Sequence, residues 1–374
     1  MKRIVITTRW YAPEKTPRAF RAKEIVEELI ERGYDIELIS PVGTLTNKMV
    51  DLHKISIKRN RLLSVSEVKG NYEKYREIIK KVFIYFIGDS PYNVLYAMRI
   101  VKYLYSNKKE REVFLSIGLP FYVHVAVALF LWRKKSSAVA IADCGDPFYA
   151  NPSFKKVFYL KYLEKWVFSK FDFVTIPIEA AQSSYLDSVS AERIKVIPQG
   201  FRLIDIPKDA YQKNIIPTFG YAGVFYESIR NPRYFFEYLL SVENNFRFVV
   251  YANANGFTSL ILAEYKEKLG DKLDVREAID REKLIPEMAT WEFVINFDND
   301  NSNQRPSKLI DYAMSKRPIL SFNQATFKPE VFTAFLHGDY SEQEHIDLSQ
   351  YDIRTVVDKF EELFQKDKAR GSRS

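Results

Sequence analysis

The chain has 374 residues, of which 47% are hydrophobic and 28% charged, and a net charge of +8. This composition excludes a disordered chain and leaves room for two domains with full cores. The single Cys144 excludes an intrachain disulfide and a zinc cluster of thiolates, and it fits a reducing compartment. The excess of basic residues favours anionic partners such as nucleotide phosphates, nucleic acid or acidic lipid.

The apolar runs predict a cytoplasmic protein without a transmembrane helix. The run near the N-terminus is too short for a signal peptide and is typical of a first β-strand. The longest run, 123–132, is well short of the roughly 20 residues that cross a bilayer. The final residues GSRS (371–374) resemble a remnant of an expression vector, so the predicted fold ends before them.

The first half of the chain alternates strand and helix patterns. Such alternation predicts parallel βαβ units with helices on both faces of a sheet. The strands are expected at 3–8, 35–40, 112–118, 138–143 and 171–177, and the helices at 18–33, 72–87, 91–106, 120–133 and 155–170.

The pattern starts again in the second half, after a connection near 200–214. The predicted fold class is therefore α/β, with two Rossmann-like, doubly wound parallel-sheet domains that face each other across a cleft. We expect the domains at 1–200 and 201–370, with the last helix packing back on the first domain. The second-half strands are expected at 193–200, 216–224, 246–252, 293–298 and 317–322, and the helices at 231–242, 258–269, 280–289, 307–315 and 352–366.

Ligands of such sheets bind at the carboxyl ends of the strands, and two loops of the second half gather polar groups there. In 220–232, Gly223 lets the backbone approach a ligand and Arg230 opens a helix, although Arg230 alone also fits a solvated position. The second loop, 296–309, contains Lys308. A lysine at a helix N-terminus is electrostatically unfavourable unless an anion binds there. Asp311 fits either a helix-surface acid or a hydrogen bond to a ribose hydroxyl.

The first half offers two more segments. The loop 7–21 lacks the glycine pattern of a dinucleotide fingerprint, but Thr16 and Arg18 could reach into the cleft. Asp143 and Asp146 follow a strand. Three interpretations fit this position: they bind acceptor hydroxyls, one of them acts as a base, or they cap a turn. The four histidines have no metal spacing, and we expect His124 in the core.

Lysines and aromatic residues share helical spacing in 154–171, and the segment 76–86 is similar. Such a helix either lies on an anionic membrane or packs as an ordinary amphipathic helix on the sheet.

Taken in order, several of these segments resemble a GT-B fold retaining glycosyltransferase of the family 4 type, as found in polysaccharide assembly. The resemblance rests on the N-terminal strand, Pro-Glu loop and helix ending in "ERGY", and on "ADCGDP", "KVIPQGF", "GYAGVFYESIRNP" and "PSKLIDYAMSKRPIL". The chain departs from the family in its "KTPRAF" loop, which replaces a Gly-Gly loop, and in lacking the usual N-terminal histidine.

The resemblance implies a hexosyl- or deoxyhexosyltransferase. Its N-terminal domain would bind the acceptor and its C-terminal domain the nucleotide sugar. Arg230 and Lys308 would bind the donor phosphates with help from Ser307, and Asp311 would hold the ribose. Asn303 stands where the family has an acid that contacts the donor sugar.

By the same resemblance the transfer would proceed with retention, without a metal or other cofactor, in capsule, lipopolysaccharide or exopolysaccharide synthesis. The acceptor would be a glycan or a lipid-linked glycan, which places the protein in the cytoplasm at the inner face of the membrane. Two alternatives remain open: a sugar-nucleotide epimerase, and a non-catalytic subunit that binds glycan or lipid. Nucleic acid is not an expected partner, because the basic residues are dispersed. The sequence assigns neither the sugar nor the nucleotide base of the donor, and it does not identify the particular acceptor.

Overall fold

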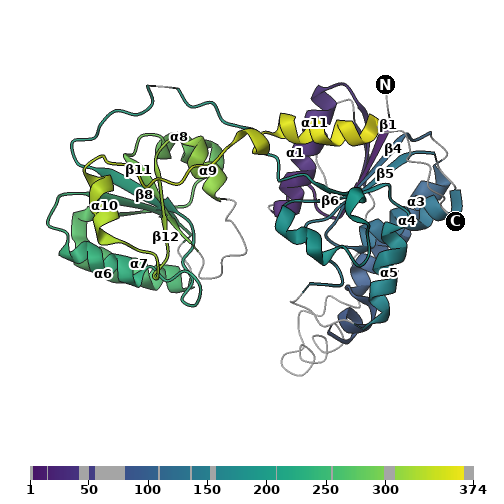
Figure 1. Cartoon of the computed structure of the whole chain (residues 1–374), viewed down its shortest axis with the longest axis horizontal. Helices are drawn as coiled ribbons and strands as arrows, with labels where there is room; N and C mark the ends of the chain where they lie inside the picture. Colours follow the sequence, from purple (N-terminus) through teal and green to yellow (C-terminus); the bar gives the residue numbers. More distant parts are fainter. Residues whose placement is uncertain are drawn as a thin grey trace. The chain divides into compact units, whose positions relative to one another are not determined.

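The computed structural model of the chain (Figure 1) describes residues 3–14, 16–41, 50–54, 81–107, 110–134, 137–151, 157–207, 209–253, 256–298 and 308–365. The chain divides into two compact units. Unit 1 comprises Met1–Arg202 and Gln350–Ser374, and unit 2 comprises Leu203–Ser349. Unit 2 is therefore inserted, in sequence, into unit 1.

Unit 1 is built on a parallel sheet of seven strands in the order β3-β2-β1-β4-β5-β6-β7. The chain starts at β1, builds outward to β3, then returns to the other side of β1 at β4. This reversal between β1 and β4 is the point where doubly wound sheets bind ligands. The strands are β1 (Arg3–Thr8), β2 (Asp35–Ser40), β3 (Val50–Lys54), β4 (Val113–Ile117), β5 (Val139–Asp143), β6 (Phe173–Ile176) and β7 (Ile194–Val196).

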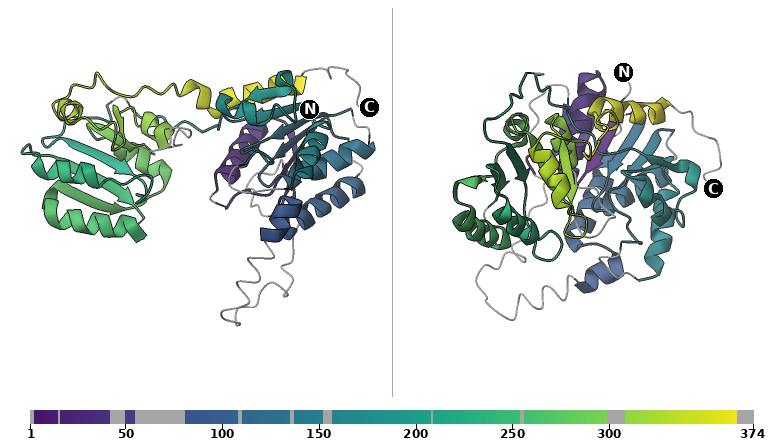
Figure 2. Two further views of the ribbon diagram at one scale, coloured as in Figure 1. Left: turned by 60° about the horizontal axis from the view of Figure 1, so that its bottom comes forward. Right: turned by 60° about the vertical axis from the view of Figure 1, so that its left-hand side comes forward.

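Helices cover both faces of this sheet (Figure 2). Because successive strand residues point to opposite faces, Val5 joins the core under one set of helices and its neighbours Ile4 and Ile6 join the core under the other. The first core takes side chains from α3 (Pro91–Ser106), α4 (Tyr122–Lys134) and α5 (Tyr159–Phe168), and the second from α1 (Pro17–Glu31) and α11 (Ile353–Gln365). A further helical segment, 81–87, precedes α3.

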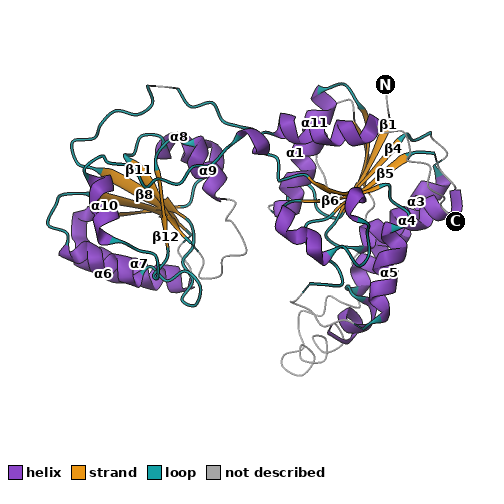
Figure 3. Ribbon diagram, in the orientation of Figure 1, coloured by secondary structure: helices purple, strands orange, loops and turns teal. Residues whose placement is uncertain are grey.

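Unit 2 repeats the design with five parallel strands in the order β10-β9-β8-β11-β12 (Figure 3). Its core is aromatic: the ring of Phe219 on β8 stacks on Phe248 of β9 and on Phe293 of β11, at centroid distances of 5.0 and 4.9 Å. The strands are β8 (Thr218–Ala222), β9 (Arg247–Ala252), β10 (Leu273–Glu277), β11 (Phe293–Phe297) and β12 (Ile319–Phe322), and the helices are α6 (Arg233–Ser241), α7 (Gly256–Leu269), α8 (Arg281–Met288), α9 (Lys308–Met314) and α10 (Pro329–Leu336).

The structure confirms the predicted fold class of two doubly wound parallel-sheet units. Two edge strands, β3 and β10, were not predicted. In β10 the burial alternates and falls along the strand, so its sequence "LDVRE" lacks the apolar run of an inner strand. The predicted strand 193–200 is shorter than expected, because pairing in β7 ends at Val196. Among the described residues, no helix is both long enough and apolar enough to cross a membrane.

The last helix, α11, belongs to unit 1 and packs against α1, which Figure 1 shows beside it. Its buried Phe360 lies in the same core as Ile25 and Leu29 of α1. Arg32, just after α1, donates to Asp358 at 2.6 Å and to Glu361 at 2.7 Å. Gly200 also contacts this helix so closely that a Cβ there would come within 2.6 Å of Ile353.

We expect Phe360→Ala to lower the free energy of unfolding of unit 1 by about 3–5 kcal/mol, because it leaves a cavity in a fully buried site. Urea denaturation followed by hydrogen exchange, peptide by peptide, measures each unit separately. The matched control is Glu362→Ala on the exposed face of α11, for which we expect a change within about 0.5 kcal/mol. Equal effects of the two substitutions would contradict the described docking of α11.

Candidate functional site

The carboxyl end of β8 in unit 2 brings two cations to one tyrosine. The Lys308 ammonium lies over the Tyr221 ring, 5.2 Å from its centroid, and Arg230 Nη1 donates to the Tyr221 hydroxyl at 3.4 Å. Tyr221 is itself buried on β8, so both cations are held at the end of this central strand. The predicted donor-binding residues Arg230 and Lys308 are therefore brought together.

Gly223 provides the space for this arrangement. A Cβ at this position would come within 1.7 Å of Lys308 Nζ and 2.7 Å of the Tyr221 hydroxyl. Its backbone N–H still donates to the Tyr251 carbonyl at 2.8 Å, which continues the pairing of β8 with β9 past the strand end. Any larger residue would move the ammonium group.

Helix α9 is anchored to the same strand end by Tyr312. The buried hydroxyl of Tyr312 accepts from the Ala222 N–H at 3.3 Å and donates to the Ala222 carbonyl at 3.0 Å. This two-way bond fixes the helix one turn after Lys308. Arg230 is fixed from the other side, since its backbone pairs with Tyr226 across a tight turn.

The electrostatic cost of this arrangement is visible in Lys308. Burial, with a further contribution from the Arg230 charge, lowers the pKa of its ammonium from the usual 10.5 to about 8, and Asp311 opposes the shift. A desolvated cation beside a second cation is unfavourable in the absence of an anion. The pair is therefore suited to bind a phosphate or diphosphate.

Asp311 lies on α9 and pairs with Arg281 of α8, with 2.5 Å between carboxylate oxygen and Nε. Burial raises the pKa of the Asp311 carboxyl, and Arg281 acts against this rise. The ion pair of Asp311 and Arg281, on adjacent helices, thus lies next to the cation pair of Lys308 and Arg230. Sequence reasoning missed Arg281, which is recognised only when α8 and α9 are placed side by side. The predicted Asn303 and Ser307 lie outside the described residues.

In unit 1, Asp143 is at the end of β5 and is fully buried. Its carboxylate accepts from Arg21 Nε and Nη2, both at 2.7 Å, from Arg18 Nη1 at 3.1 Å and from the Thr175 hydroxyl at 2.7 Å. Despite burial, these donors hold the pKa of the Asp143 carboxyl below its usual value. The catalytic role expected of Asp143 stays a prediction, and its carboxylate is buried and bound by three side chains in this structure. Asp143 positions Arg18 and Arg21.

The other residues predicted in unit 1 are placed differently. Thr16 is the N-cap of α1, and its hydroxyl accepts from the Ala19 N–H at 3.2 Å. Arg18 passes over Gly145, where a Cβ would come within 1.7 Å of Nη2. Asp146 is exposed and lines a pocket. Of the two acids predicted as catalytic, Asp146 is exposed at the pocket and Asp143 is buried.

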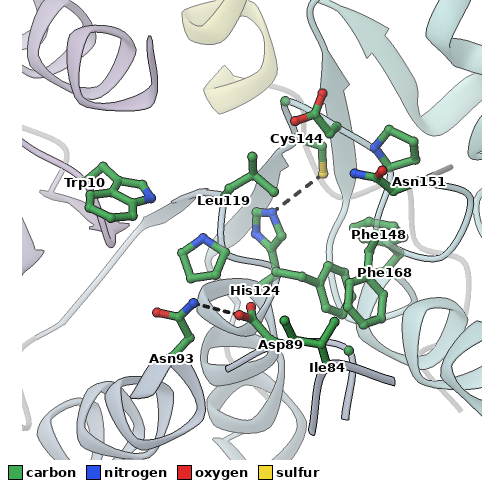
Figure 4. A pocket seen from close by; sticks show the side chains of 17 residues that line it. Trp10, Ile84, Asp89, Asn93, Leu119, His124, Cys144, Phe148, Asn151 and Phe168 are labelled. Atoms are coloured by element: carbon green, nitrogen blue, oxygen red, sulfur yellow. Dashed lines mark hydrogen bonds between the residues drawn. The ribbon is translucent and has the colours of Figure 1, made fainter. Parts of the chain in front are cut away.

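That pocket, of about 350 Å³, lies in unit 1 at the carboxyl ends of β4 and β5 (Figure 4). Its floor is aromatic, with Phe121 stacked on Phe148 at a centroid distance of 4.0 Å. Polar groups stand among the apolar ones, including Asp89, which accepts from the Asn93 amide at 2.7 Å. Mostly apolar walls with a few polar groups are typical of ligand pockets. The residues missed from the sequence come from segments far apart in the chain: Trp10, Ile84, Asp89, Asn93, Leu119, Phe121, Phe148 and Asn151.

His124 lines the pocket but remains a core residue, as predicted. It is 1% exposed, and its Nδ1 lies 2.8 Å from the Ser116 hydroxyl. Burial lowers the pKa of the imidazole to about 3, so the ring is neutral. Burial also raises the pKa of the neighbouring Cys144 thiol, which excludes a reactive thiolate at neutral pH. Within the described part of the chain, no three His, Cys, Asp or Glu side chains gather as metal ligands would.

Two doubly wound parallel-sheet units in one chain fit the GT-B fold class, and comparison with solved structures supports this fold. No protein-family model and no curated protein matches the sequence. The structure of TarM is similar with a TM-score of 0.61 at 9% identity, over 98% of this chain and 99% of that one. A glycosyltransferase from Rickettsia africae gives 0.61 at 12% identity over 99% of each chain.

The Anabaena protein HepE in complex with UDP-glucose gives a TM-score of 0.52 at 9% identity, over 97% of this chain and 99% of that one. At such identities the likeness shows the fold, which is that of GT-B glycosyltransferases. The family 4 assignment made from the sequence stays a prediction.

The cation pair predicts an unusual stability effect. Without ligand at neutral pH, Lys308→Met should raise the free energy of unfolding of unit 2 by about 1 kcal/mol, because it removes a desolvated charge. The Lys308 pKa is lower in the folded chain (about 8) than the usual 10.5. Between these values the unfolded chain binds more protons, so the wild type gains stability as the pH rises and the difference between the proteins shrinks.

Urea denaturation at pH 7 and pH 10 measures the difference in free energy of unfolding between the two proteins and its change with pH. Lys283→Met on the exposed side of α8 serves as the control, and it should change neither the free energy of unfolding nor its pH dependence. If Lys308→Met were less stable than the wild type at pH 7, this would contradict the conclusion that the desolvated Lys308 ammonium destabilises unit 2.

Proposed function

We propose that the protein is a glycosyltransferase that moves a sugar from a nucleotide-diphosphate donor to a glycan acceptor. The observation that carries this proposal is the pair Arg230 and Lys308, held on Tyr221 with the Lys308 pKa lowered to about 8. Their position at the end of the central strand of a doubly wound sheet is where nucleotides bind in such folds. The structure of HepE with UDP-glucose supports a UDP-sugar donor for the fold.

The two cations would act on the leaving group. Cleavage of the bond between sugar and phosphate leaves negative charge on the diphosphate, and preorganised cations stabilise that charge as it develops. The arrangement in unit 2 needs little reorganisation, because Tyr312 and the turn at Tyr226 fix both sides of the pair. We therefore propose metal-independent transfer, with retention by front-face attack in which the donor phosphate helps deprotonate the acceptor hydroxyl.

The remaining donor contacts would surround this pair. Asp311, oriented by Arg281 at 2.5 Å, would accept from the ribose hydroxyls. Ser307 would add a hydroxyl or N–H to the phosphates, and Asn303 would contact the donor sugar.

The pocket of unit 1 is the proposed acceptor site. Its aromatic floor suits the C–H faces of a sugar ring, and the carboxylates of Asp89 and Asp146 suit its hydroxyls. Asp146 is the catalytic candidate exposed at this pocket, with Thr16 and Arg18 at the start of α1 nearby in the fold. A lipid-linked glycan of capsule, lipopolysaccharide or exopolysaccharide synthesis is the proposed acceptor class. It would place the protein at the cytoplasmic face of the cell membrane.

One observation favours a second candidate, a non-catalytic glycan-binding subunit. The acid nearest to the expected catalytic position, Asp143, is occupied by Arg18, Arg21 and Thr175. Donor binding without hydrolysis or transfer to any glycan acceptor would support this candidate.

Donor binding tests the proposal directly. Titration calorimetry with UDP, GDP and dTDP should show binding of at least one nucleotide. Arg230→Gln and Lys308→Met should each weaken it about tenfold to a hundredfold, since a charged hydrogen bond contributes about 1.5–3 kcal/mol. Arg247→Gln, at the amino end of β9, and Lys283→Met are matched controls with the same loss of charge. Unchanged binding in both site variants would refute the diphosphate site.

The pKa of Lys308 adds a pH signature. The ammonium must be charged to hold phosphate, and its pKa in the free protein is about 8. Nucleotide affinity should therefore be constant near pH 7 and fall by about tenfold per pH unit above pH 8, until the pKa of the complex is reached. In Lys308→Arg the fall should vanish, because a guanidinium stays charged. The same pH dependence in both proteins would exclude Lys308 as its source.

A further inference from the structure

The helical segment 81–87 and the start of α5 form one exposed, mainly aromatic patch on unit 1. The patch consists of six side chains that are between 41% and 70% exposed: Val82, Tyr85, Phe86, Phe158, Tyr159 and Tyr162. The two segments contact each other directly, since Val157 N–H donates to the Tyr85 carbonyl at 3.2 Å and the Tyr159 hydroxyl donates to the Phe86 carbonyl at 2.5 Å. Contiguous exposed apolar surface of this kind marks an interaction site.

The patch continues along α5. Trp166 lies one helical turn after Tyr162, and its ring packs edge-on against Trp132 of α4 with 6.0 Å between centroids. Trp132 is itself 54% exposed. Tyr and Trp combine an apolar ring with a polar tip, which suits the boundary between headgroups and acyl chains.

The charges on these elements are almost all positive. The cations are Lys81, Arg133, Lys134, Lys161 and Lys165, whereas the acid on α5, Glu164, is buried under the patch. The Glu164 carboxylate accepts from the Phe148 N–H at 3.2 Å and from the Ser188 hydroxyl at 2.9 Å. Asp187 pairs with Lys161 at 2.7 Å. The resulting surface is aromatic with a basic border, which complements anionic phospholipid.

The patch shares a wall with the pocket. Ile84 and Gly88 line the pocket, as Figure 4 shows for Ile84, while Tyr85 and Phe86 are exposed on the patch. The segment is attached on both sides: the Tyr122 hydroxyl donates to the Ile87 carbonyl at 2.8 Å, and a Cβ at Gly88 would come within 2.4 Å of Phe148. A surface that binds the patch is therefore separated from the pocket by the helical segment 81–87.

We infer that unit 1 docks through this patch on a bilayer surface rich in anionic phospholipid, so that the pocket takes its ligand from that membrane. This inference rests on the proposed function for the identity of the ligand, a lipid-borne glycan, but not for the docking itself. The lipid part would stay in the bilayer at the patch, and the sugar head would enter the pocket past segment 81–87.

Vesicle co-sedimentation tests the docking without any donor or acceptor. We expect the protein to sediment with vesicles of phosphatidylcholine mixed with phosphatidylglycerol, and weakly with phosphatidylcholine alone. Raising the salt from about 0.15 M to about 1 M should weaken the binding, because it screens the basic border. The variant Tyr85→Ser, Phe86→Ser, Tyr162→Ser should lose about tenfold or more in partitioning.

The matched control carries Leu240→Ser, Leu260→Ser and Ile279→Ser, which are exposed apolar positions in unit 2. A charge variant with Lys81→Gln, Lys134→Gln and Lys165→Gln should lose the preference for phosphatidylglycerol, whereas Lys213→Gln, Arg247→Gln and Lys283→Gln should retain it. Circular dichroism confirms that each variant is folded. As an independent readout in variants that each keep one tryptophan, vesicles with brominated acyl chains should quench the fluorescence of Trp132 and leave that of the buried Trp291 unchanged.

Wild-type sedimentation of the aromatic variant, or equal binding to both vesicle types, would overturn the inference. So would self-association of the protein through the patch, detected by sedimentation velocity without lipid and abolished by the same variant. Nucleotide binding is measured on these proteins in parallel. Its absence with intact vesicle binding would refute the proposed function alone, and its presence without vesicle binding would refute the docking alone.

Discussion

Two positive charges held on one tyrosine at the end of β8 are the constraint around which unit 2 is organised. Lys308 and Arg230 come from different segments, and neither is stabilised by the other. They stay together because Tyr312 binds the backbone of Ala222 in both directions and because the turn at Tyr226 fixes Arg230. The fold thus supplies the energy that keeps the ammonium group in an unfavourable place, and a bound anion would recover it.

A buried charge at a strand end of unit 1 is organised in the opposite way. At the end of β5 the buried charge of Asp143 is fully compensated by Arg21, Arg18 and Thr175. A compensated charge of this kind fixes the geometry of its neighbours and has no need of a ligand. The ligand-binding character of unit 1 therefore lies in the aromatic pocket beside it. Both units are doubly wound parallel sheets, but they use buried charge for different purposes.

Much of this organisation could be predicted from the sequence, because it depends on local pattern. The alternation of buried strands and amphipathic helices identified both sheets, and an unfavourable lysine at a helix start pointed to Lys308. Edge strands β3 and β10 were missed because their sequences "VDLHK" and "LDVRE" lack a continuous apolar run, and in β10 the side chains are partly exposed. The burial of Asp143 was not predicted, because the sequence "ADCGDP" gives no sign that Arg21 and Thr175 lie against its carboxylate. The pocket was invisible, since its walls come from segments distant in the chain.

The position of α11 has a consequence for how the chain folds during synthesis. Unit 2 is complete at Ser349, but the core of unit 1 lacks Val356, Phe360 and Phe364 until α11 has left the ribosome. The first domain to be translated is therefore the last to be finished, and the sheet surface beside α1 stays uncovered while the whole of unit 2 is made. A nascent chain in this condition exposes apolar surface to chaperones and to its neighbours. A premature stop ahead of α11 would release a polypeptide with one intact half and one half permanently open.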